Sequence, residues 1–205
     1  MKKILLFIVS VFIVFISFSQ TDLKRQAFWG ASFIPNPGSK AGVTVQRAVA
    51  GSPAQLAGLQ NGDVIVRANG ILLSDPYVYG KTFRSFRGGD KVVLSVLRND
   101  KLIDLFITPT RRPLEQYKDI EVQYGSIITD KGHHVRTILT KPAGARGKLP
   151  VIFVTQWLSC SQVEVNVNNM SDTDSLFNDL ITRSGYAFMR VEKPGLGDSE
   201  GPDCS

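Results

Sequence analysis

Short apolar stretches alternate with turn-forming residues between positions 42 and 108. Alternation of apolar and polar positions is typical of half-buried strands, and Gly, Asn and Asp between such stretches favour tight turns. The pattern predicts strands at residues 42–49, 64–68, 91–97 and 102–108. The last two are expected to pair as a hairpin across Asn99-Asp100.

Two short helices are predicted among these strands. Ser52 is a residue type that caps helix N-termini, Pro53 fits the first helical position, and Gly58 favours the left-handed conformation that ends a helix. A second helix is expected to start at Ser74-Asp75-Pro76 and to run to about residue 86. Together the strands and helices predict a small β-barrel with two helices.

A second pattern follows a proline- and arginine-rich linker at residues 110–118. Residues 121–129 and 133–141 predict an antiparallel hairpin. The unbroken apolar run at 151–155 is typical of a strand buried on both faces of a parallel sheet. A helix capped by Ser171 or Asp172 and a strand at 185–191 complete a strand, crossover helix and strand, which is an α/β unit.

The N-terminus has the pattern of a secretory signal. Lys2-Lys3 precede an apolar run at 4–18, which ends in Ser17-Phe18-Ser19, with small residues where a signal peptidase acts. Residues 1–19 are therefore predicted to be a signal peptide and the protein to be exported, periplasmic or secreted, with no membrane span after cleavage. A retained anchor is the alternative, but the run is shorter than the ~20 residues that span a bilayer.

Charge is distributed unevenly between the two units. Residues 21–113 carry 13 Lys and Arg against 6 Asp and Glu, whereas residues 114–205 carry 9 against 12. The first unit is expected to favour anionic partners. Its basic residues are scattered rather than clustered with exposed aromatics, which argues against nucleic acid as a partner.

The segment at residues 52–70 has the pattern S-P-A-x-x-A-G-L-x-x-G-D-V-I-x-x-x-N-G, which resembles the PDZ domains of bacterial exported proteases. The resemblance covers residues 25–109 and implies a module that binds the C-termini of peptides or proteins. It implies that the loop at 27–30 receives the terminal carboxylate through backbone N–H groups and that the peptide adds as a strand to residues 31–34.

The helix that starts near Pro76 would form the other wall of this groove. The implied peptide-binding residues are Phe28, Trp29, Gly30, Ala31, Ser32, Phe33, Tyr77, Lys81 and Arg84. The loop of this family usually has a smaller residue where Trp29 stands. The alternative is that Trp29 and Tyr77 are only core or rim aromatics that touch no ligand.

Residues 149–160 and 185–201 resemble the third and fourth strands of an α/β-hydrolase domain with their following loops. In that family the first loop supplies the oxyanion hole and opens with His-Gly, which Gln156-Trp157 replaces here. The oxyanion-hole candidates are Trp157 and Leu158, since such a donor needs only a well-placed backbone N–H. The alternative is an ordinary strand-to-helix turn. The predicted fold class is mixed: a PDZ-like barrel, then an incomplete α/β domain at residues 119–205.

Gly197-Asp-Ser199-Glu-Gly201 spells the G-x-S-x-G pattern of a nucleophile elbow. An elbow joins a strand directly to a helix, but here several residues separate the pattern from the strand that ends at Val191. Ser199 is therefore not expected to be a nucleophile. His133 and His134 are expected to be solvated, and because neighbouring strand residues point to opposite faces, they cannot chelate one metal together. No metal or cofactor is predicted.

Cys160 and Cys204 are the only cysteines. If the strands at 151–155 and 185–191 are parallel neighbours, the loops that follow them lie at the same edge of the sheet. A disulfide between the two cysteines is predicted, with two free buried thiols as the alternative.

These patterns favour an exported PDZ-containing serine hydrolase of the esterase or peptidase type. The nucleophile, acid and base are absent from these 205 residues, so the chain is expected to be a fragment. The alternative is a non-enzymatic PDZ peptide-binding protein with a degenerate α/β appendage. A trypsin-like protease is disfavoured because the PDZ-like unit precedes the second domain. Substrate, peptide specificity and oligomeric state cannot be read from the sequence.

Overall fold

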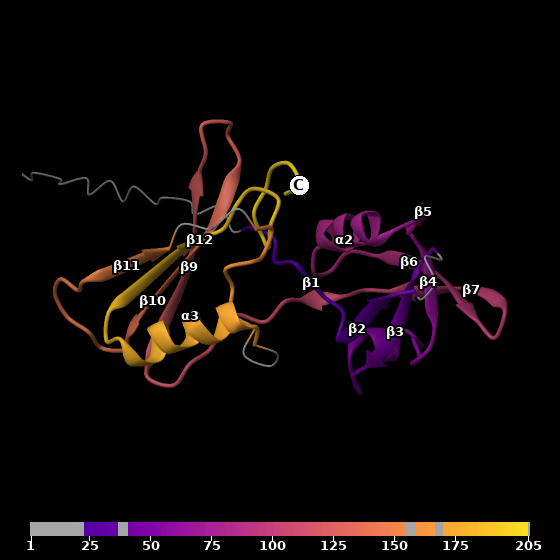
Figure 1. The fold of residues 1–205 in the computed structure, drawn as a ribbon, viewed down its shortest axis with the longest axis horizontal. Helices are drawn as coiled ribbons and strands as arrows, with labels where there is room; N and C mark the ends of the chain where they lie inside the picture. Colours follow the sequence, from indigo (N-terminus) through magenta and orange to yellow (C-terminus); the bar gives the residue numbers. More distant parts are fainter. Residues whose placement is uncertain (1–22, 37–40, 155–158, 167–169, 205) are drawn as a thin grey trace, which may run out of the picture.

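A computed structural model describes residues 23–36, 41–154, 159–166 and 170–204. The chain forms two units, with the strands β1 (Ala27–Phe28) and β8 (Thr110–Arg111) between them (Figure 1). These two short strands pair with each other in antiparallel register. The predicted linker at 110–118 therefore begins with a strand rather than with irregular chain. The predicted signal peptide and the candidates Trp157 and Leu158 lie outside the described residues.

The first unit is a sheet with strand order β2-β3-β4-β6-β7, with the short β5 paired to β4. All neighbouring strands are antiparallel. The helices are α1 (Pro53–Leu56) and α2 (Pro76–Ser85). The strands are β2 (Ala31–Pro35), β3 (Val43–Ala48), β4 (Val64–Ala68), β5 (Ile71–Leu72), β6 (Val92–Arg98) and β7 (Lys101–Ile107). The predicted β-rich unit with two helices is confirmed.

Local hydrogen bonds account for both helix starts. The side chain of Ser52 accepts a hydrogen bond from the N–H of Gln55, as expected for an N-cap. The carboxylate of Asp75 accepts from the N–H groups of Tyr77 and Val78 at 2.9 and 3.0 Å. Each helix has proline in its first turn, where no partner for a backbone N–H is needed.

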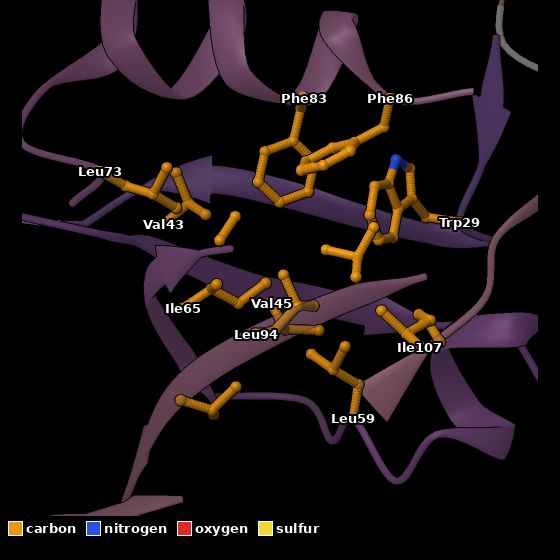
Figure 2. Close-up of a cluster of buried hydrophobic side chains, with 14 residues drawn as sticks. Trp29, Val43, Val45, Leu59, Ile65, Leu73, Phe83, Phe86, Leu94 and Ile107 are labelled. Atoms are coloured by element: carbon orange, nitrogen blue, oxygen red, sulfur yellow. The ribbon is translucent and has the colours of Figure 1, made fainter. Parts of the chain in front are cut away.

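The core of the first unit lies between α2 and the sheet. In Figure 2 the Trp29 ring packs against Phe83 and Phe86, above Val45 and Leu94 of the sheet. Ring centroids are 5.0 Å apart for Trp29 and Phe83 and 5.6 Å for Trp29 and Phe86. Such aromatic pairs add to the hydrophobic gain from burial and fix α2 over the sheet.

The second unit is a four-stranded sheet in the order β11-β12-β10-β9. β11 and β12 are parallel, and the other neighbours are antiparallel. The elements are β9 (Ile120–Ile128), β10 (His134–Pro142), β11 (Val151–Val154), α3 (Asp172–Arg183) and β12 (Ala187–Val191). The helix α3 lies across one face of this sheet (Figure 1), and Phe177 packs on Phe188 with centroids 5.4 Å apart.

The prediction that residues 151–155 form a strand buried on both faces was wrong. Within the described residues β11 is an edge strand with β12 as its one neighbour. Val151 and Phe153 are each 57% exposed. Successive side chains alternate between faces, and α3 covers only the face that carries Ile152 and Val154.

The predicted disulfide is confirmed. Cys160 and Cys204 are bonded, with their Cα atoms 5.7 Å apart and a sequence separation of 44. They lie in the segments that follow β11 and β12, at the edge of the sheet where parallel strands end together. In the part of the chain described here, no helix is long and apolar enough to span a membrane.

Buried ion pairs connect the two units. Arg25, just before β1, pairs with Glu164 at 2.7 Å and with Asp198 at 2.5 Å, both in the second unit. Arg136 of β10 also pairs with Asp198, at 3.1 Å. On the outer side of this contact, Arg84 of α2 pairs with Asp203. The relative position of the units is therefore held by charges as well as by the chain.

Candidate functional site

The free edge of β2 is the backbone to which a peptide could add. Among the described residues, β2 ends the sheet and pairs only with β3. The N–H of Val49 donates to Gly30 and that of Asn36 donates to Gly42, which fixes which β2 residues face β3. Because inward and outward groups alternate along an antiparallel strand, the backbone of residues 31, 33 and 35 faces away from β3. Pro35 has no N–H, so Ala31 and Phe33 supply the donors of this edge.

Aromatic side chains join β2 to α2. The ring of Phe33 lies 6.4 Å from that of Tyr79 and 5.3 Å from that of Phe83. Tyr79 and Phe83 are 4.9 Å apart. Burial raises the pKa of Tyr79, so its hydroxyl is neutral at physiological pH. The space between β2 and α2 therefore has an apolar, aromatic floor.

The loop before β2 is fixed in place through hydrogen bonds that its carbonyl groups accept. The carbonyl of Trp29 accepts from the N–H of Ala54 at 3.0 Å, and that of Gly30 accepts from Val49 at 2.8 Å. Neither the N–H of Trp29 nor that of Gly30 donates a hydrogen bond to the described part of the chain. Gly30 has a φ of +67°, and a Cβ there would overlap the side chain of Ser52. The loop thus presents two unused donors.

This loop lines a cavity of about 590 Å³ that the first unit does not close alone. One side is formed by the exposed residue Phe28 together with Trp29 and Gly30. The remaining walls come from the segment at residues 112–116 and from Val165 and Asn166 of the second unit. A volume of this size is within the range of small-ligand sites.

A second cavity of about 380 Å³ lies at the other end of β2. It is bounded by Pro35 at the end of β2 and by Asp75 and Pro76 at the start of α2. The two cavities therefore flank the aromatic floor at either end of β2. An extended ligand along β2 would run from one to the other.

The structure divides the residues that the sequence suggested for peptide binding. Gly30, Ala31 and Phe33 lie together on the loop and the β2 edge, whereas the Trp29 side chain is 7% exposed and belongs to the core. Ser32 is exposed, and its hydroxyl lies 3.4 Å from Gln46 of β3.

The suggested side chains of α2 do not face Phe33. Tyr77 and Lys81 are exposed, and Arg84 is engaged with Asp203. The α2 residue that contacts Phe33 besides Phe83 is Tyr79, which the sequence interpretation missed. The spacing of 79, 83 and 86 at helical intervals was the signal that marked the inward face.

The Gly-rich turn after β12 has a structural role. Ser199 is 1% exposed, and its Oγ accepts a hydrogen bond from the N–H of Arg136 at 2.9 Å. No helix follows the turn in the described residues, so the arrangement is not that of a nucleophile elbow. The histidines differ from the expectation of solvated residues, since both are half-buried. Among the residues described, no group of three His, Cys, Asp or Glu side chains could hold a metal ion.

Comparison with known proteins identifies the first unit. Residues 16–108 match the family described as PDZ domain. Over 74 residues the chain is 36% identical to the probable periplasmic serine endoprotease DegP-like of Chlamydia muridarum (strain MoPn / Nigg). The match covers 36% of this chain and 15% of that protein. The first unit is thus a PDZ domain, similar to part of a DegP-like protease.

One solved structure that is similar to this chain is the HtrA-type protease AlgW with a tripeptide. It is 26% identical with a TM-score of 0.39, and the match covers 44% of this chain and 33% of that one. Another is the HtrA3 PDZ domain bound to a phage-derived ligand, at 26% identity and a TM-score of 0.36, over 41% of this chain and 85% of that one. The family match ends at residue 108 and does not extend to the second unit.

Proposed function

We propose that this chain is an exported protein that binds the C-terminal end of extended peptides in its PDZ domain. The observation that carries the proposal is the free β2 edge beside two unused N–H donors at Trp29 and Gly30. A peptide added antiparallel to β2 would pair with Ala31 and Phe33 and place its terminal carboxylate at the loop. Export is supported by the N-terminal pattern of the sequence and by the periplasmic relative.

Peptide ligands of related proteins support this proposal. One related structure contains a tripeptide and another the ligand FGRWV. In the present chain, Pro35 removes a donor from the β2 edge, so the ligand would be held mainly by its last few residues. The aromatic floor formed by Phe33, Tyr79 and Phe83 favours apolar side chains on those residues.

Binding of a peptide panel to the whole chain tests the proposal. Fluorescein-labelled pentapeptides with varied C-terminal residues are titrated by fluorescence polarisation, each as the free acid and as the C-terminal amide. We expect apolar free acids to bind with micromolar dissociation constants and the amides to bind at least tenfold more weakly. Equal affinity for acid and amide, or no binding by any peptide, would contradict the proposal.

Hydrolysis of esters or peptide bonds is a second candidate function. It is favoured by the parallel strands β11 and β12, which are joined through α3 as in an α/β unit. The protein would be assayed with p-nitrophenyl esters and with a serine-reactive fluorophosphonate, and the labelled residue would be identified by mass spectrometry. We expect no adduct at Ser199, because its side chain is buried. Absence of both ester turnover and labelling would contradict this candidate.

A further inference from the structure

Besides Arg84, four arginines lie at the contact between the PDZ domain and the second unit, and three of them are closely paired. Arg190 lies 2.7 Å from Glu115, Arg25 lies 2.7 Å from Glu164, and Arg136 lies 3.1 Å from Asp198. Arg112 is the fourth, and it must share the Glu164 carboxylate with Arg25. Its Nε is 3.5 Å from Glu164, a weaker contact than that of Arg25.

Besides Glu164, two neutral side chains position the guanidinium of Arg112. Its Nη1 donates to the side-chain oxygens of Gln162 and Gln26. Its Nη2 donates to no residue in the described part of the chain, and the side chain is 23% exposed. Arg112 therefore keeps an unused donor and a positive charge that Glu164 balances only in part.

This arginine lines the 590 Å³ cavity together with Trp29 and Gly30. The acidic side chain in the same wall, Glu115, is satisfied by Arg190, by the N–H of Val165 and by the hydroxyl of Tyr117. It therefore presents no uncompensated negative charge to the cavity. An anion entering the cavity would meet the two loop N–H groups and the guanidinium of Arg112.

We infer that Arg112, which lies outside the matched PDZ segment, binds the terminal carboxylate of the peptide in this composite pocket. The inference rests on the proposed peptide function and adds a specificity-determining residue to it. The second unit then has a direct part in ligand recognition, because Gln162 and Glu164 orient Arg112 and Val165 and Asn166 close the pocket. A charge-assisted contact of this kind distinguishes a free carboxylate from an amide.

The test compares Arg112→Gln with Arg111→Gln in the whole chain. Arg111 is the adjacent, exposed residue of β8 and is not in the pocket wall, so its substitution removes the same charge as a matched control. The probe is the tightest free-acid pentapeptide of the panel and its amide. We expect Arg112→Gln to raise the dissociation constant of the free acid about tenfold and that of the amide less than twofold. Arg111→Gln should change neither dissociation constant by more than twofold.

A second pair of variants avoids the ion-pair network, where a substitution could disturb folding. Leu114 is 51% exposed and lines the same pocket, so Leu114→Glu adds a carboxylate that repels the ligand, with Leu114→Gln as the neutral control. We expect Leu114→Glu to bind the free acid at least fivefold more weakly than Leu114→Gln, and added salt to narrow this difference.

The outcomes separate the two proposals. If the wild-type chain prefers the free acid, but Arg112→Gln matches Arg111→Gln and Leu114→Glu matches Leu114→Gln, the inference about Arg112 fails and the PDZ function stands. If the wild-type chain does not distinguish acid from amide, both fail.

Discussion

Arg25 Nη1 lies 2.5 Å from Oδ2 of Asp198, although 173 residues separate them in sequence. Asp198 also accepts from the N–H of Gln26 at 2.7 Å and from Arg136 at 3.1 Å, and it is 3% exposed. This carboxylate of the Gly-rich turn therefore connects residues 25–26, just before β1, to β10 of the second sheet. Removal of one partner from such a buried network leaves uncompensated charge.

Asp198→Asn tests the strength of this connection. The substitution keeps the size of the side chain but leaves Arg25 and Arg136 without their shared counter-charge. We therefore expect the free energy of unfolding to fall by about 3 kcal/mol. Urea denaturation followed by tryptophan fluorescence measures the change. Asp179→Asn is the control, because Asp179 forms an exposed pair with Arg183 and its loss should change stability by less than about 0.5 kcal/mol. Equal effects of the two substitutions would show that the network contributes little.

Gly30→Ala tests the conformation of the ligand loop. Gly30 has positive φ, and a Cβ there would overlap the side chain of Ser52 at the start of α1. Gly62 also has positive φ, at +88°, but a Cβ there would meet nothing within 4 Å. We expect Gly62→Ala to destabilise by about 1–2 kcal/mol, from the left-handed conformation alone, and Gly30→Ala by more. The melting temperatures of the two variants are compared by thermal unfolding. A larger loss of stability in Gly62→Ala than in Gly30→Ala would contradict the steric role of Gly30.

Glu192 makes stability depend on pH. Burial raises the pKa of its carboxyl from 4.5 to about 7, and its Oε1 lies buried without a hydrogen-bond partner among the described residues. The folded state binds this proton more tightly than the unfolded chain does, so protonation of Glu192 stabilises the fold. The stabilisation is fully present below about pH 4.5 and is lost as the pH rises through 7.

Glu192→Gln replaces the protonated carboxyl with a neutral amide. Relative to the wild type, we expect the variant to gain on the order of 3 kcal/mol at pH 8 and little at pH 4.5. Stability curves measured by urea denaturation from pH 4.5 to 8 check this. Parallel curves for the two proteins would mean that Glu192 does not titrate in this range.

The disulfide should stabilise the second unit by restricting its unfolded state. Cys160 and Cys204 have a sequence separation of 44, and for a loop of about this length chain entropy predicts a contribution on the order of 4 kcal/mol. Cys160→Ser and the Cys160→Ser/Cys204→Ser double variant should lose similar stability, and reducing agent should affect only the wild type. A wild-type protein whose denaturation midpoint is insensitive to reducing agent would contradict this.

Local chemistry explains which elements the sequence could predict. The helix caps at Ser52 and Asp75 and the turn at Asn99-Asp100 depend on contacts between residues a few positions apart. The local sequence is therefore enough to predict them. The pairing of the two cysteines was also predictable, because crossover topology brings the loops after two parallel strands together.

The same local patterns were insufficient for the ligand site. Two sets of residues are both spaced as a helix face: Tyr77, Lys81 and Arg84, and Tyr79, Phe83 and Phe86. The contact of Tyr79 with Phe33 of β2 shows that the second set faces the sheet. The exposure of Val151 and Phe153 likewise depends on what covers the sheet, which an apolar run does not specify.

The sequence by itself predicted the helices and turns, the PDZ character of the first unit and the pairing of the two cysteines. These properties follow from short-range hydrogen bonding and apolar periodicity. The tertiary structure alone decided that Arg25, Arg112 and Arg136 meet Glu164 and Asp198 between the units. The energy of a buried charge is set by partners that lie far away in the chain, and only the packed fold brings these partners within a few ångströms.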